Sequence, residues 1–429
     1  MAHSFHKCFH SIFLRAGMRK QSSRLFRFLL LLTIILSFLF VSACAKTEAI
    51  KESETPVPTP SLRIQSTPHP SSPTPPLIAT QKATLSATLD LTMPAATASL
   101  TTEVSHVQNP YIGIWISKEE LAKLPMHGLA WDSLKAAADK DPGIPAMSDQ
   151  NENNDVYVLA QALVYARTGE LKYREQVIDN LMKAIDTEKG GRTLALGRNL
   201  PGYVISADLV NLPADPKTDA VFRSWLQRAL IENLDGKSLR STHEDRPNNW
   251  GTHAGAARAA VAIYLGDKDE LEHTAAVFHG YLGDTTTYHG FKYDVDLSWQ
   301  CDPNHPIGIN PVGCVKGGHS IDGALPEEMR RGDSFQWPPI ATGYAWEALQ
   351  GAFVQAEILN RAGFPTWDWQ DQALLRAVNF LYSIDWKPTG DDEWLVWLIN
   401  HSYKTNFPTV IPEKPGKNMG WTDWTFGNP

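Results

Sequence analysis

The sequence feature that most constrains the fold is a series of helical patterns, arranged in pairs, along the last three quarters of the chain. In each pattern apolar residues recur every three or four positions, and a short turn with Gly or Asp separates it from the next. We expect helices over 155–168, 171–187, 218–234, 248–265, 343–362, 368–384 and 391–403. Because no alternating series predicts strands, the sequence indicates an all-α fold of helical hairpins, an α/α toroid or solenoid.

A long irregular stretch, residues 284–340, interrupts this series. Loops of this length are uncommon unless they are functional. The stretch contains Cys301 and Cys314 in the sequence CDPNHPIGINPVGC. An exported protein can keep a disulfide, so we expect these two cysteines to pair. A zinc site that includes His305 is the alternative, but no CxxC spacing supports it.

The N-terminus carries the pattern of a secretion signal. Basic residues precede an apolar run from Leu29 to Val41, which is too short to span a membrane comfortably. The run ends in VSAC, which resembles the lipobox of bacterial lipoprotein signals. This resemblance implies cleavage before Cys44 and lipidation of its thiol, and an uncut signal anchor is the alternative. We therefore expect a signal peptide over 1–43 and a lipid anchor that attaches the protein to the membrane.

The composition divides the rest of the chain into a linker and a folded domain. Residues 44–107 are rich in Ser, Thr, Pro and Ala and contain no aromatic residue, so we expect a disordered linker. Residues 108–429 are long enough for one large domain or two small ones, and we expect a single catalytic domain. Linker and anchor together predict that this domain lies outside the cytoplasm, at the cell envelope. The net charge of −8 provides no basic field for binding nucleic acid.

The most informative stretch for chemistry is RPNNWGTHAG, which opens a predicted helix. Asn249 and His253 are four positions apart and therefore share one helix face. Alanine residues follow on or near that face and leave room for a ligand. Two Asn and a His on such a face suit the binding of a carboxylate. The alternative is a pair of capping Asn residues with a buried, hydrogen-bonded His.

Two further stretches, GGHSIDGALPEEMRRG and GYAWEALQ, bring His319, Arg331 and Tyr344 close together in the sequence. Each residue alone also has an ordinary structural interpretation. His319 could hydrogen-bond within the loop, Arg331 could pair with a neighbouring Glu, and Tyr344 could be a core aromatic at a helix start.

Four features of this chain resemble the polysaccharide lyases of the alginate lyase superfamily. They are the double Asn at 248–249, DGALPEEMRRG at 322–332, Tyr344 with the ALQ that follows it, and AGFPTWDW at 362–369. The resemblance covers most of 108–429 and is greatest for the branch that includes glucuronan- and alginate-cleaving lyases. It implies an incomplete α/α toroid and an acidic polysaccharide substrate.

The resemblance also implies roles for single residues. Asn249 helps to neutralise the substrate carboxylate, Arg331 assists it, and Tyr344 transfers the proton. Trp250 departs from the pattern, because a His directly follows the double Asn in the best-known alginate lyases. The imidazole must then come from one of three other residues: His253, His319 or His289. We expect further contacts with the substrate from Asn248, Trp250, Arg330, Trp337 and Trp346.

The chemistry explains why such a site needs these residue types. Removal of the C5 proton of a uronate builds an enolate-like dianion, which requires donors that neutralise the carboxylate. Amide, imidazole and guanidinium groups provide them without a metal or another cofactor. One Tyr can act as base and then as acid if both protons lie on one face of the sugar. If they lie on opposite faces, His would be the base and Tyr the acid.

Two other functions remain open at this point. A glycoside hydrolase on a similar toroid needs two carboxylates, which could come from Asp322, Glu327, Glu328, Asp391, Asp392 or Glu393. A non-catalytic, surface glycan-binding lipoprotein would fit the Trp-rich tail with Trp421 and Trp424. The sequence contains no GxSxG, GxxxxGK[ST] or HExxH motif, so nothing supports a serine hydrolase, a phosphate-loop enzyme or a zincin.

Overall fold

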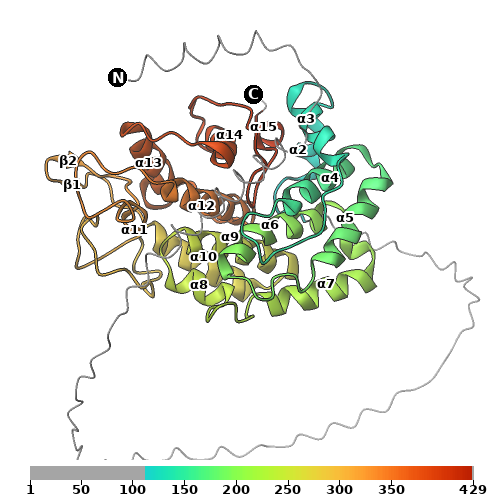
Figure 1. Ribbon diagram of the computed structural model, residues 1–429, viewed down its shortest axis with the longest axis horizontal. Helices are drawn as coiled ribbons and strands as arrows, with labels where there is room; N and C mark the ends of the chain where they lie inside the picture. Colours follow the sequence, from blue (N-terminus) through green and yellow to red (C-terminus); the bar gives the residue numbers. More distant parts are fainter. Residues whose placement is uncertain (1–111, 428–429) are drawn as a thin grey trace, which may run out of the picture. The chain divides into compact units, whose positions relative to one another are not determined.

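The computed structural model describes residues 112–427 (Figure 1). The predicted signal peptide over 1–43, its Cys44 and the linker over 44–107 lie outside this range. Within the described residues, no helix has the length and apolar character needed to cross a membrane.

The described part of the chain is helical, which confirms the predicted all-α class. Its only strands, β1 (Val315–Lys316) and β2 (His319–Ser320), have two residues each and form a hairpin. The helices are α2 (Lys118–Lys123), α3 (Leu129–Ala138), α4 (Asn154–Thr168), α5 (Leu171–Ala184), α6 (Thr193–Leu209), η1 (Leu212–Ala214), α7 (Pro216–Ala229), α8 (Leu239–Asp245), α9 (Asn249–Leu265), α10 (Lys268–Leu282), α11 (Pro326–Met329), α12 (Tyr344–Arg361), α13 (Trp369–Ser383), η2 (Gly390–Glu393), α14 (Trp394–Tyr403) and α15 (Thr422–Thr425).

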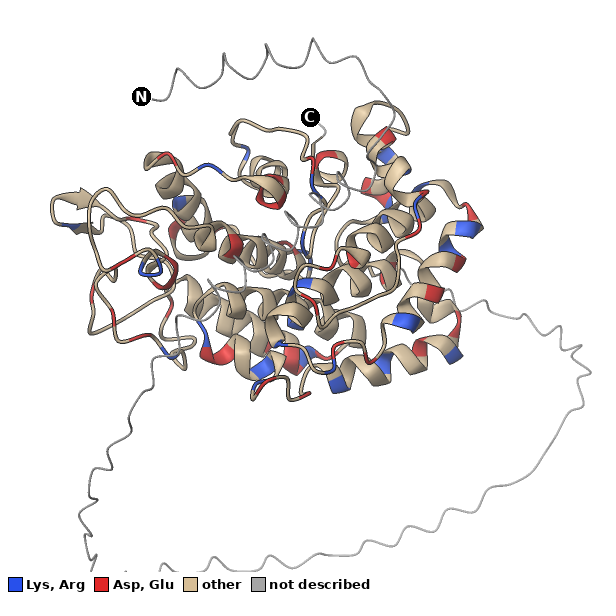
Figure 2. Ribbon diagram, viewed as in Figure 1, with Lys and Arg blue, Asp and Glu red and all other residues tan. Residues whose placement is uncertain are grey.

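These helices form an inner and an outer layer, the arrangement of an α/α toroid. The inner helices α4, α6, α9 and α12 pack against one another and are almost entirely buried. The outer helices α5, α7, α10 and α13 pack on them with one apolar face each. Figure 2 shows Lys, Arg, Asp and Glu residues along the outer helices, with α7 as the clearest case.

Glycines let the two central inner helices, α9 and α12, approach closely (Figure 1). A Cβ added at Gly351 would lie 2.4 Å from the backbone nitrogen of His253, and one at Gly255 would lie 2.3 Å from Gln355 Oε1. The first contact joins residue 253 of α9 to residue 351 of α12, and the second joins residue 255 to residue 355. Because the numbers increase in the same direction along both helices, α9 and α12 run parallel. Their N-termini therefore lie at the same end of the bundle, and this places Asn249 and Tyr344 near each other.

Helix α6 was absent from the predicted series, and its burial explains why. All of its residues from Thr193 to Leu209 are buried, so it has no polar face that would reveal a helical period. It also contains Pro201, which normally argues against a helix interior. Helix α9, in contrast, starts one residue after the predicted boundary, because Asn248 caps it by accepting a hydrogen bond from the backbone N–H of Trp250 at 3.1 Å.

The C-terminal segment folds back onto the beginning of the domain. Trp421 Nε1 donates to the carbonyl of Val156 at 3.0 Å, and Trp424 Nε1 donates to the carbonyl of Pro125 at 2.9 Å. Both Trp rings are buried. The interpretation of Trp421 and Trp424 as a glycan-binding surface is therefore wrong, since these rings belong to the core.

The long stretch between α10 and α12 is irregular, as expected, and the predicted disulfide between Cys301 and Cys314 is confirmed. Buried Asn310 organises the disulfide loop, because its side chain accepts from the backbone N–H of Cys301 and donates to the carbonyl of Trp299. This stretch carries the β-hairpin and α11, which brings the PEEMRRG sequence against the N-terminus of α9.

Candidate active site

Three of the predicted site residues meet where the N-termini of α9 and α12 adjoin α11. Arg331 Nη1 donates to Asn249 Oδ1 at 3.4 Å. The guanidinium carbon of Arg331 also lies 3.9 Å from the centroid of the Tyr344 ring. Arg331 thus links a carboxamide on α9 with a phenol on the first residue of α12. The structure brings Asn249, Arg331 and Tyr344 together, with Asn249 only 2% exposed and Tyr344 43% exposed.

A buried carboxyl group, Glu328, contacts both Asn249 and Arg331. It accepts a short hydrogen bond from the backbone N–H of Asn249, and its Oε2 lies 3.5 Å from Arg331 Nη1. Burial raises the pKa of Glu328 to about 7, against the opposing effects of the Arg331 charge and the Asn249 N–H. The pairing of Arg331 with a neighbouring Glu is therefore present together with its contacts to Asn249 and Tyr344.

The predicted substrate-contacting residues have different environments. Arg330 is held by Glu327 at 2.8 Å and by Asp294 at 3.2 Å. Trp250 is half-buried beneath the guanidinium of Arg246, 4.4 Å from its ring. The capping side chain of Asn248 is half-buried beside it.

The other two predicted substrate contacts, Trp337 and Trp346, differ in their exposure to solvent. Trp346 is buried and donates from Nε1 to the carbonyl of Trp386 at 3.1 Å, so its ring is part of the core rather than of a sugar-binding surface. Trp337 is 38% exposed and stacks on His319 with ring centroids 4.3 Å apart. Of the two, only Trp337 presents a ring face to solvent.

None of the three candidate histidines hydrogen-bonds to Asn249, Arg331 or Tyr344 among the described residues. His253 is completely buried one turn beyond Asn249, and its Nδ1 pairs with Asn418 Nδ2 at 2.9 Å. Burial holds the pKa of His253 well below its usual value, so its ring is neutral at pH 7. His319 lies on the β-hairpin and His289 is exposed in the same irregular stretch.

A polar cluster that sequence reasoning missed lies one helical turn further along α12. Buried Arg198 of α6 pairs through Nη1 with Glu347 at 3.2 Å and through Nη2 with Asp391 at 3.5 Å. Gln350 donates to the same Asp391 carboxylate at 3.2 Å. Burial raises the pKa of Glu347, while the positive charge of Arg198 opposes this shift. Glu347 follows Tyr344 by three positions, and this spacing is the one sequence signal that could have revealed the cluster.

Comparison with known families adds an independent observation. A family model described as alginate lyase matches residues 154–285, from α4 to the residues after α10. This chain is similar to alginate lyases. The matched region contains Asn249 and His253, whereas Arg331 and Tyr344 lie beyond it. No curated protein matches the chain.

The similarity to alginate lyases supports a polysaccharide lyase that acts on an acidic polysaccharide. It also fits the two-layered helical fold, because the matched region includes the inner helices α4, α6 and α9 together with the outer helices that pack on them.

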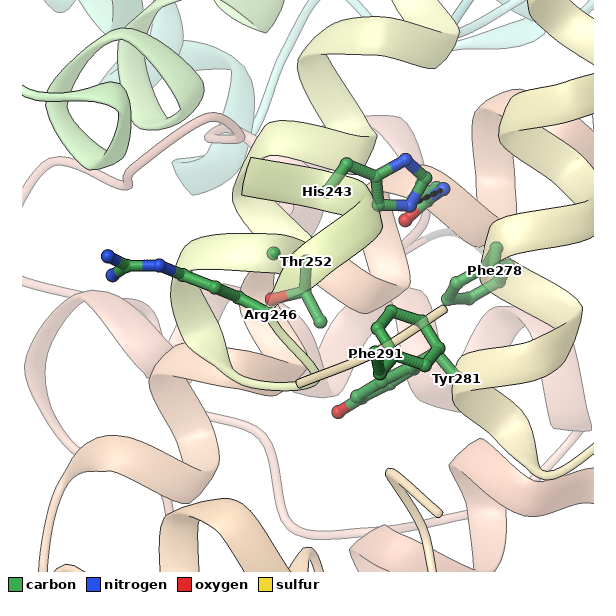
Figure 3. A pocket seen from close by; sticks show the side chains of 8 residues that line it. His243, Arg246, Thr252, Phe278, Tyr281 and Phe291 are labelled. Carbon is green, nitrogen blue, oxygen red and sulfur yellow. Dashed lines mark hydrogen bonds between the residues drawn. The ribbon is translucent and has the colours of Figure 1, made fainter. Parts of the chain in front are cut away.

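A small pocket behind α9 is not the substrate site (Figure 3). Its lining includes His243, Thr252, Phe278, Tyr281 and Phe291. Figure 3 shows the rings of Phe278, Tyr281 and Phe291 on one side of His243 and Thr252. Burial keeps the pKa of His243 well below its usual value. None of the residues that meet at Arg331 lines this pocket, so it is separate from the group formed by Asn249, Arg331 and Tyr344.

The carboxylates considered for a glycoside hydrolase are mostly engaged in structural pairs. Asp322 pairs with Arg376 at 2.7 Å, and Glu327 pairs with Arg330. Asp392 is buried and accepts from Gln350 Nε2 at 2.7 Å. These contacts explain the acidic residues as parts of the scaffold, so the geometry favours the lyase function.

Proposed function

We propose that this protein cleaves a uronate-containing polysaccharide, of the glucuronan or alginate type, by β-elimination. The observation that carries this proposal is the convergence of Asn249, Arg331 and Tyr344. A carboxamide, a guanidinium and a phenol side by side are the groups that the abstraction of a proton next to a carboxylate requires.

In this proposal Arg331 and Asn249 bind the uronate carboxylate. The Oδ1 atom of Asn249 accepts from Arg331, and no hydrogen bond from its Nδ2 group is found among the described residues. This amide therefore keeps a donor for the substrate. The hydrogen bonds from both groups become stronger as negative charge moves from C5 onto the carboxylate. Arg331 and Asn249 therefore stabilise the transition state more than the bound substrate.

Tyr344 transfers the protons. Its side chain is 43% exposed, and its ring lies against the Arg331 charge, which stabilises negative charge on the phenol oxygen. As the phenolate, the Tyr344 oxygen takes the C5 proton. The electron pair of the C5–H bond forms the C4=C5 double bond, and the C4–O4 bond breaks with its electron pair on O4. The same phenol then protonates O4 if both protons lie on one sugar face. For opposite faces, His319 or His289 of the irregular stretch would supply the base.

His253 has a positioning role in this proposal. Its buried, neutral ring connects α9 to Asn418 of the C-terminal segment and fixes the helix turn that carries Asn249. Trp337, stacked on His319, would provide a flat face for a neighbouring sugar.

We also propose that the protein is exported and anchored through a lipid on Cys44, because the N-terminal pattern resembles a lipoprotein signal. Cells that express the full chain with a fatty acid label should incorporate it into the protein. A Cys44→Ala variant should lose the label and leave the membrane fraction, and a labelled variant would refute the anchor.

The reaction is tested by incubating the full-length protein with alginate, glucuronan and hyaluronan. A lyase produces unsaturated ends that absorb ultraviolet light. A glycoside hydrolase would instead produce reducing ends without this absorbance, and a glycan-binding protein would retain the polymer without shortening it. Reducing ends without absorbance would refute the proposal.

A further inference from the structure

Glu328 is the most unusual charged group beside the proposed carboxylate site. It belongs to α11 and is only 1% exposed. One of its oxygens accepts from the Asn249 backbone, and the other faces Arg331 Nη1 at 3.5 Å. Both of the groups proposed to hold the substrate carboxylate thus touch this carboxyl directly.

The charges around Glu328 are unevenly balanced. The neighbouring cation, Arg330, is engaged by Glu327 and Asp294, and this leaves Arg331 as the cation in contact with Glu328 among the described residues. A uronate carboxylate bound to Arg331 would add a second anion to this single cation. Two carboxylates that share one site cannot both remain ionised at low cost, so one of them takes a proton.

We propose that Glu328 takes up one proton from solvent when a uronate carboxylate binds to Arg331 and Asn249. This inference rests on the proposed function. The protonated carboxyl keeps a carbonyl oxygen for the Asn249 N–H, so the hydrogen bond survives the change. Arg331 is then free to balance the substrate charge alone. Binding should consequently weaken as the pH rises and the free enzyme loses this proton.

Other titratable groups near Glu328 do not offer the same exchange. On its own helix, Glu327 is committed to Arg330. From α10, Tyr281 faces Glu328, and from the irregular stretch Tyr293 faces Glu327. Burial raises the pKa of both phenols, which remain neutral. The pKa of Glu328, raised by burial to about 7, instead places its proton exchange in the neutral range.

Calorimetry on the full-length Tyr344→Phe variant, which should bind without cleaving, tests the inference. Titration with oligosaccharides of alginate and of glucuronan at pH 7, in buffers of different ionisation enthalpy, should show an uptake of about half a proton per site. The uptake should increase from pH 6 to pH 8, since a larger share of free Glu328 is then ionised. Above pH 7 the Kd should rise by up to about tenfold per pH unit.

Adding Glu328→Gln should abolish the uptake and make the Kd independent of pH. The control is Glu188→Gln, at a buried carboxyl that hydrogen-bonds to Trp225 Nε1 and whose pKa burial also raises, and it should retain both. Binding without buffer-dependent heat, or equal uptake in the Glu328→Gln variant, would overturn the inference while leaving the lyase function intact. If neither oligosaccharide binds, the proposed function fails as well. Should Glu328→Gln not fold, the pH profile of uptake in the Tyr344→Phe protein alone decides.

Discussion

Replacing Tyr344 with Phe separates the chemistry of this site from its stability. The change removes a single oxygen atom. No hydrogen bond to that hydroxyl is found among the described residues, and the ring that contacts Arg331 at 3.9 Å remains. Because nothing is left unpaired and no cavity forms, the free energy of unfolding should change by less than about 0.5 kcal/mol.

The effect on catalysis should be far larger. Without the hydroxyl, the site loses the group that we propose takes the C5 proton and returns it to O4. Loss of general acid–base catalysis costs about a hundredfold or more in turnover, which is two factors of ten or about 2.7 kcal/mol of activation free energy. Turnover is followed through the ultraviolet absorbance of the unsaturated ends, with saturating substrate so that kcat is measured directly.

A matched control is Tyr165→Phe on α4, a half-buried phenol that likewise has no described hydroxyl partner. It should keep full turnover and an unchanged melting temperature. If Tyr344→Phe also retained near-normal turnover, Tyr344 would not be the proton-transferring group. If its melting temperature fell sharply, the lost activity would reflect damage to the fold rather than to the chemistry.

Three other substitutions test separate parts of the structure. Asn249→Ala removes one donor to the substrate carboxylate and should lower kcat by about a hundredfold, measured by the same absorbance. Arg198→Met leaves two carboxylates facing each other and should cost about 3 kcal/mol of stability in urea unfolding at pH 7. The loss should be smaller at pH 5, because burial raises the pKa of Glu347 and this carboxyl then takes a proton more readily. Cys301→Ser opens the loop to Cys314 and should cost roughly 3 kcal/mol, a loss that a reducing agent reproduces in the parent protein.

The sequence predicted those parts of the structure that depend on local patterns. Helix α9 and its capping Asn248 follow from the Pro-Asn-Asn start and the regular apolar spacing, and the disulfide follows from two cysteines in one loop. The meeting of Asn249 with Arg331 came from the family resemblance rather than from spacing, because the two residues lie on different elements.

The remaining parts depend on contacts between distant segments. Arg198 gave no signal, since it belongs to a helix that is buried on every side, and its partner Asp391 lies far along the chain. Asn418 reaches His253 only because the C-terminal segment returns to the centre of the bundle. For the same reason Trp421 and Trp424, which the sequence suggested as a glycan-binding surface, are buried in the core.

The return of the C-terminal segment to α4 also determines when the domain can finish folding during synthesis. Lys417 binds Asn153, and Trp421 donates to the carbonyl of Val156, so the first inner helix lacks part of its packing until residues 417–421 have emerged from the ribosome. The domain therefore cannot complete its folding before this segment is available, and a stop codon before residue 417 should yield a chain that proteases degrade.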